Sequence, residues 1–104
     1  MKKILILAAA MALSATASAA DPAAGKLKAK ACAACHGENG VSQALGFPKL
    51  AGQRQDYLAR ALNDYKSGAR KNAIMAGQVA NLKRGDIADL AAYYSSLQAL
   101  TTKY

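Results

Sequence analysis

The feature that most limits what this 104-residue chain can fold into is a five-residue segment holding both of its cysteines and its only histidine. The segment reads Cys32-Ala33-Ala34-Cys35-His36, a C-x-x-C-H pattern. Two thiols at this spacing can reach the two vinyl groups of one porphyrin and form thioethers. The adjacent imidazole is then held beneath the ring, where it can bind the iron. The motif predicts one covalently attached haem c, with Cys32 and Cys35 as attachment residues and His36 as an axial ligand.

Three other kinds of site use cysteines at this spacing. A disulfide between these two thiols would close a very small loop and stabilise little, because the entropic gain grows with loop length. A thioredoxin-like site needs a strand-helix-strand unit beside the cysteines, and no stretch of this sequence alternates convincingly as a strand. A zinc site needs about four ligands, whereas the chain has two Cys and one His. Haem attachment is therefore favoured, and a secreted dithiol module without haem remains an alternative.

The first 19 residues have the pattern of an export signal. Lys2 and Lys3 precede an apolar run over residues 4–13, and residues 17–19 (Ala-Ser-Ala) match an A-x-A cleavage site. The run is too short to span a bilayer, which needs about 20 residues as a helix. We therefore predict a signal peptide at residues 1–19.

Cleavage after Ala19 or Ala20 would leave one domain, residues 20–104, which we expect in the periplasm and without a transmembrane segment. This domain has only 14 large apolar side chains: nine Leu, two Ile, two Val and one Phe. Their share is below the roughly 20% at which a charged chain is suspect as a self-sufficient globule. Small domains of this kind usually need an added core element, and an attached haem would supply it.

Hydrophobic periodicity predicts an all-α domain with three main helices and long connections. The first helix is expected over residues 22–33, with Asp21 as its N-cap. A second shows helical spacing of apolar residues over 57–65 and ends at Gly68. A last helix has the same period over residues 87–97.

Met75 is the only methionine outside the expected signal peptide. It lies within residues 70–82, a segment that we expect to be a loop followed by a short helical turn. Methionine often fills gaps in a core, but beside a C-x-x-C-H motif it is a candidate second axial ligand, since His/Met ligation is standard for such haems. With His36 and Met75 both on the iron, no position is free for a substrate, so one-electron transfer is expected rather than catalysis.

Several further motifs follow one another along the chain: Gly25, 32–37 (CAACHG), 47–53 (FPKLAGQ), 57–58 (YL), 66–70 (KSGAR), 74–77 (IMAG) and 86–94 (DIADLAAYY). In this order the sequence resembles a class I c-type cytochrome of the small soluble bacterial monohaem type, and it is similar to single halves of dihaem periplasmic cytochromes. The resemblance covers essentially the whole predicted domain. It implies the small class I cytochrome c fold, with three main helices plus short helical turns wrapped around one covalently bound haem.

The resemblance also implies contacts and departures. Pro48 would offer its backbone carbonyl to the Nδ1–H of His36, which orients the ligand. Gly25 in the first helix would let that helix cross closely over the last one. Ala73 stands where relatives often have a proline, which would leave the loop before the methionine less rigid. Residues 83–85 (Lys-Arg-Gly) stand where a Ser, Thr or Asp cap is common, which would weaken capping of the last helix.

Charge indicates the kind of partner. The formal charge of +8 falls to +6 without Lys2 and Lys3. Such a surplus aids solubility and can steer the protein toward acidic docking surfaces on redox proteins, such as a membrane reductase and a terminal oxidase or reductase. Candidate docking residues are Lys49, Arg54, Lys66, Arg70, Lys71, Lys83 and Arg84. Nucleic acid is not expected as a partner of an exported chain without aromatic-basic interleaving.

We therefore expect a monomeric periplasmic electron carrier that is not itself an enzyme. Two alternatives use the same haem. The domain could be the electron-delivering subunit of a larger enzyme, or a ligand-binding or peroxidatic haem protein from whose iron Met75 is absent or easily displaced. Binding of carbon monoxide by the reduced protein separates the last case from a six-coordinate carrier.

Overall fold

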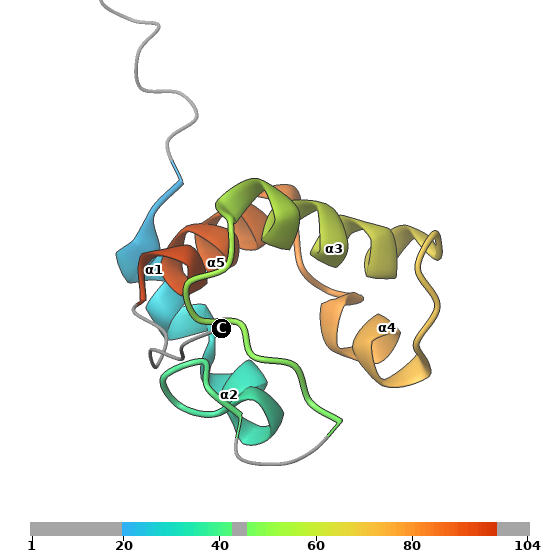
Figure 1. The fold of residues 1–104 in the computed structure, drawn as a ribbon. Helices are drawn as coiled ribbons and strands as arrows, with labels where there is room; N and C mark the ends of the chain where they lie inside the picture. Colours follow the sequence, from blue (N-terminus) through green and yellow to red (C-terminus); the bar gives the residue numbers. More distant parts are fainter. Residues whose placement is uncertain (1–19, 43–45, 98–104) are drawn as a thin grey trace, which may run out of the picture.

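The computed structural model describes residues 20–42 and 46–97. These residues form helices α1 (Pro22–Lys28), α2 (Lys30–His36), α3 (Gln55–Ser67), α4 (Ala73–Val79) and α5 (Arg84–Ser96) and contain no β-strand (Figure 1). The predicted all-α class is confirmed. The predicted signal peptide lies outside the described residues. None of the helices in the described part of the chain is long and apolar enough to cross a membrane.

The first predicted helix, residues 22–33, is two helices in the structure. α1 begins as expected, with the Asp21 carboxylate accepting a hydrogen bond from the helix's second amide at 2.9 Å. The backbone tightens at Ala29, whose N–H is shared between the carbonyls three and four residues earlier. The chain then continues as α2 to His36, beyond the predicted end. All of the C-x-x-C-H motif therefore lies on one short helix.

The core lies where α1 crosses α5 and where α3 packs beside α5 (Figure 1). Gly25 permits the crossing, because a Cβ at this position would lie 2.1 Å from the backbone oxygen of Asp89 and 2.7 Å from the Cβ of Tyr93. The predicted close approach of the first and last helices is thus confirmed. The buried cluster around it consists of Ala29, Leu58, Leu90, Ala91 and Tyr94.

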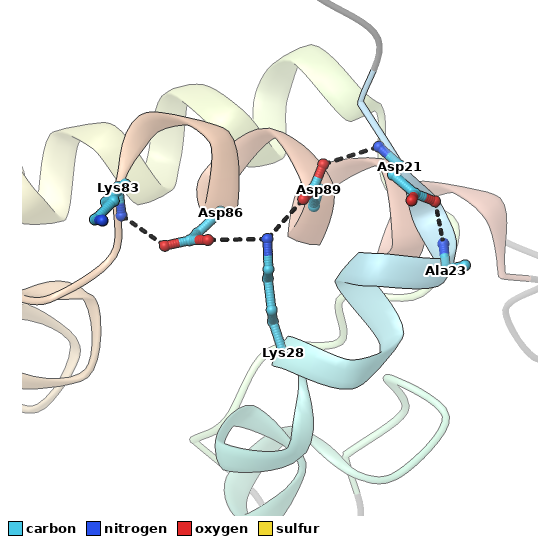
Figure 2. A network of polar contacts seen from close by, with 6 residues as sticks. All are labelled: Asp21, Ala23, Lys28, Lys83, Asp86 and Asp89. Atoms are coloured by element: carbon cyan, nitrogen blue, oxygen red, sulfur yellow. Dashed lines mark hydrogen bonds and ion pairs between the residues drawn. The ribbon is translucent and has the colours of Figure 1, made fainter.

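A polar network also joins α1 to α5 (Figure 2). The Lys28 ammonium lies 2.9 Å from a carboxylate oxygen of Asp86 and 2.6 Å from one of Asp89. The other oxygen of Asp89 accepts from the Asp21 amide at 2.8 Å. Hydrogen bonds to Asp89 and Asp86 raise the pKa of Lys28, and the Lys28 ammonium lowers the pKa of both carboxyl groups. The ends of α1 are therefore both tied to α5.

The start of α5 refines one expectation. Lys83 is the N-cap residue and its side chain has no acceptor, as the sequence indicated. However, the carboxylate of Asp86, the third helical residue, accepts from the Lys83 amide at 2.9 Å. This is the reverse half of a capping box, and it also places a negative charge at the positive end of the helix. The expected lack of a side-chain cap at Lys83 is confirmed, and Asp86 compensates for part of it, so the start of the helix is better held than residues 83–85 alone indicated.

α3 ends where predicted, since Gly68 adopts a left-handed conformation with φ of 89° and its amide bonds back to the helix. The next segment differs from the prediction. Met75 lies on the two-turn helix α4 and not in a loop, because the Asn72 side chain caps this helix and accepts from the Met75 amide at 3.0 Å. α4 packs on α3, and the Lys66 ammonium donates to the Ala80 carbonyl at 2.9 Å.

Candidate haem-binding site

Cys32 and Cys35 lie one turn apart on α2 and both are free thiols. Cys32 is half-buried against the core cluster, whereas Cys35 is exposed. Burial raises the pKa of the Cys32 thiol, although its contact with the Tyr94 side chain opposes this shift. A raised pKa is the opposite of the thiolate stabilisation that a dithiol redox site requires. Cys32 therefore lacks the thiolate stabilisation that a dithiol redox site requires.

His36 ends α2 and is buried, with 7% of its surface exposed. Its Nδ1 lies 2.7 Å from the backbone oxygen of Pro48. Because a carbonyl can only accept, Nδ1 must carry the hydrogen, which leaves the lone pair of the neutral ring on Nε2. The Phe47 ring meets the imidazole edge-on, with centroids 6.4 Å apart. Phe47 begins the 47–53 motif, but the sequence assigned no contact to it. These contacts orient His36 with Nε2 as the atom available to a metal.

The loop between α2 and α3 holds Pro48 in place. Gly37 has φ of 88°, and a Cβ there would lie 2.3 Å from a loop carbonyl oxygen, so the sharp exit from α2 requires glycine. The Gly40 carbonyl accepts from the Leu50 amide at 2.8 Å, and the Gly52 amide donates to the Tyr94 carbonyl at 2.9 Å. The loop is thereby tied both to the end of α2 and to α5.

The structure brings Cys32, Cys35, His36 and Pro48 together and places Met75 on a different element. Met75 is half-buried on α4. In Figure 1, α2 and α4 lie on opposite sides of the space below α3 and α5. Met75 therefore shares no helix or loop with the other candidate residues, and the helix that carries it packs on α3.

The donor set and its surroundings fit a haem. Two thiols, one imidazole with a free Nε2 and one thioether are the groups that vinyl attachment and axial ligation require. Phe47, whose ring contacts His36, is 36% exposed, and Ile74, the neighbour of Met75 on α4, is 62% exposed. In the described residues no group of three or more His, Cys, Asp and Glu side chains converges as a metal site. The arrangement thus suits a porphyrin better than a bare metal ion.

Comparison with known proteins gives consistent matches. The family model described as "Cytochrome c" matches residues 22–98. Cytochrome c4 of Pseudomonas aeruginosa is 47% identical over 98 residues, which cover 92% of this chain and 49% of that protein. Cytochrome c-554(548) of Halomonas halodenitrificans is 44% identical over 81 residues, which cover 75% of this chain and 98% of that protein.

A solved structure agrees with these matches. The crystal structure of reduced recombinant cytochrome c4 from Pseudomonas stutzeri has a TM-score of 0.74 and 43% identity, and the match covers 77% of this chain and 47% of that one. This chain therefore spans about half the length of the two cytochrome c4 proteins, and nearly the whole of the shorter relative.

Proposed function

The chain belongs to the cytochrome c family, and from this premise we propose that it is a periplasmic one-electron carrier with a His/Met-ligated haem c. The observation that most supports this function is the buried His36. Its Nδ1 lies 2.7 Å from the Pro48 carbonyl oxygen, and the two free thiols, Cys32 and Cys35, precede it in the chain. A histidine oriented in this way presents Nε2 in one direction, as an axial ligand must.

Each residue has a distinct role in this proposal. Cys32 and Cys35 attach the haem through thioethers, and His36 binds the iron through Nε2. Pro48 accepts the Nδ1 hydrogen and so raises the basicity of the ligand. Met75 provides the second axial ligand from α4, and its soft thioether favours the reduced metal. The bound haem supplies one-electron exchange between Fe(II) and Fe(III).

The same ligands make the protein a carrier and not an enzyme, because His36 and Met75 together leave no open position for a substrate. Export by residues 1–19, with cleavage after Ala19 or Ala20, would deliver the domain 20–104 to the periplasm. The charge of +6 that remains without Lys2 and Lys3 suits brief docking on acidic surfaces of redox proteins. Electron-transfer rates with such partners should therefore fall as salt concentration rises.

The test is to express the full chain in a host with a haem-attachment system and record oxidised and reduced visible spectra. We expect sharp reduced bands that survive denaturing extraction, and a far-red band of Met–iron(III) ligation. Met75→Leu should lose the far-red band and bind carbon monoxide in the reduced state. Gln78→Ala, an exposed change on the same helix, should keep the band and bind none.

Other outcomes would contradict the proposal at different levels. Covalent haem without the far-red band in the unaltered protein would rule out Met75 as ligand and favour a ligand-binding haem protein. A colourless protein from a competent host would rule out haem attachment altogether, leaving the dithiol module.

A further inference from the structure

Tyr94 is a buried tyrosine on α5 to which the proposed function gives no role. Its side chain is 3% exposed, and its ring centroid lies 5.0 Å from that of Tyr93 on the same helix. A Cβ at Gly40 would lie 3.0 Å from the ring carbon Cδ1, so the glycine in the loop after α2 leaves room for the ring. The Tyr94 carbonyl accepts from the Gly52 amide at 2.9 Å. Ring and backbone are therefore fixed by α5 and by the loop that also carries Pro48.

The hydroxyl of Tyr94 forms a hydrogen bond with the Cys32 side chain, which packs against the same buried cluster. This bond lowers the pKa of the Cys32 thiol, in opposition to the larger effect of burial. Burial, followed by the neighbouring Cys32, raises the pKa of the Tyr94 hydroxyl. The bond acts on both groups as expected of a phenol that donates to sulfur, because such a bond stabilises a thiolate and is lost when the phenol ionises. The phenol therefore keeps its hydrogen at neutral pH and directs it at Cys32.

Attachment of a haem would fix the direction of this hydrogen bond. A thiol can donate or accept, whereas a thioether sulfur has no hydrogen and can only accept. A buried phenol is unfavourable without a hydrogen-bond partner, so the Tyr94 hydroxyl should keep its contact with the sulfur after attachment. Cys35, by contrast, is exposed to solvent. The two attachment sulfurs therefore lie in different surroundings, and the Cys32 sulfur has a fixed donor.

We propose that the Tyr94 hydroxyl donates a hydrogen bond to the thioether sulfur of Cys32 and thereby raises the reduction potential of the attached haem. This inference rests on the covalent haem of the proposed function but not on Met75 as the second axial ligand. The positive end of the hydroxyl dipole points at the sulfur next to the ring, where it disfavours the extra positive charge of the oxidised iron. Burial strengthens this effect, because the local dielectric is low. Tyr94 is a positioning residue that acts through Cys32 and takes no part in electron exchange itself.

Two conservative variants test the effect on the potential. Tyr94→Phe removes the hydroxyl and keeps the ring that Gly40 accommodates. Tyr93→Phe is the matched control, because it removes the same group from the next residue of α5, which is half-buried and whose Cβ lies at the crossing with α1. The midpoint potential of the haem-loaded full chain is measured for both variants and for the unaltered protein. Tyr94→Phe should shift the potential to a lower value, and Tyr93→Phe should leave it unchanged.

Resonance Raman spectra of the reduced protein give a second readout, which a purely structural role would not move. After complete exchange into D₂O, the carbon–sulfur stretching bands of the unaltered protein should shift, because the phenol hydrogen on the sulfur is replaced by deuterium. Tyr93→Phe should show the same shift, and Tyr94→Phe should show none. The comparison of H₂O with D₂O needs only the unaltered protein, so it decides the hydrogen bond even if Tyr94→Phe folds poorly.

Other results would overturn the inference. If Tyr94→Phe equalled Tyr93→Phe in potential, the proposal would be wrong whatever the change in melting temperature, and Tyr94 would only fill the core. Carbon–sulfur bands of the unaltered protein that did not move in D₂O would exclude the hydrogen bond. The visible spectrum reports on the proposed function separately. Absence of the far-red band would contradict Met75 ligation and leave this comparison intact, whereas a colourless protein would contradict the covalent haem and this inference with it.

Discussion

The α1–α5 side of the molecule and the α2–α4 side are held together by different means. Where α1 crosses α5, backbones approach closely at Gly25, and Leu90 is 1% exposed. On the other side, the loop between α2 and α3 is held by backbone hydrogen bonds at its glycines, and α4 packs on α3. There Ile74 is 62% exposed. We expect the bound haem to cover exposed apolar side chains on the α2–α4 side, such as Ile74, and so to complete the core there.

The largest expected effect tests whether the second half depends on haem attachment. Replacing both Cys32 and Cys35 with Ser should leave little folded protein in the periplasm, because the haem can no longer be joined to the chain. Yield and covalent haem staining measure the loss. In whatever protein remains, hydrogen exchange should be faster in α2 and α4 than in α5. A stable, well-folded double variant would show that the two halves do not differ as described.

A second prediction compares one apolar residue from each half. Leu90→Ala should destabilise the protein by about 2–5 kcal/mol, because it opens a cavity in packed core. Ile74→Ala would cost little if its side chain stayed exposed, but should cost about 1–3 kcal/mol if the haem covers it. Denaturant unfolding of the haem-loaded variants measures both. A negligible change for Ile74→Ala would place this residue outside the haem contact.

A third prediction concerns the helix crossing itself. Gly25→Ala should destabilise by about 1–3 kcal/mol, because the new methyl group would meet the backbone of α5. Gly85→Ala is the control: it lies on α5 with open space around its Cβ position, and it should be neutral or stabilise by up to about 1 kcal/mol. Equal effects of the two changes in chemical unfolding would mean that the crossing is not close.

The smallest expected effect concerns the Lys28 network. Its carboxyl groups have lowered pKa values in the folded state, so their contribution is present above the unfolded pKa of about 4 and is lost as pH falls through the folded value. Lys28→Gln should therefore reduce the melting temperature near neutral pH, and the difference from the unaltered protein should shrink in acid and at high salt. A difference that is constant from neutral to acid pH would exclude this electrostatic origin.

Features that depend on neighbours within one or two turns were predictable. The Asp21 cap, the Gly68 end of α3 and the apolar spacing of α3 and α5 all follow from residues close in the chain. The Asn72 cap of α4 is equally local, since Asn is a favoured N-cap residue. The backbone break at Ala29 had no such signal, because alanine favours an unbroken helix and the requirements of the helix crossing act from α5.

The amino-acid sequence was sufficient to predict a covalently attached haem, because C-x-x-C-H acts through covalent reach over five residues, and to predict the helical class, because helical periodicity is short-range. How those helices are tied together became visible only in the folded molecule. The His36–Pro48 contact joins residues 12 apart and the Asp21–Asp89 contact joins residues 68 apart, while Asp86 caps α5 and binds α1 at once. The physical reason is range: propensity and spacing describe a few neighbouring residues, whereas these contacts exist only after separate helices have packed against one another.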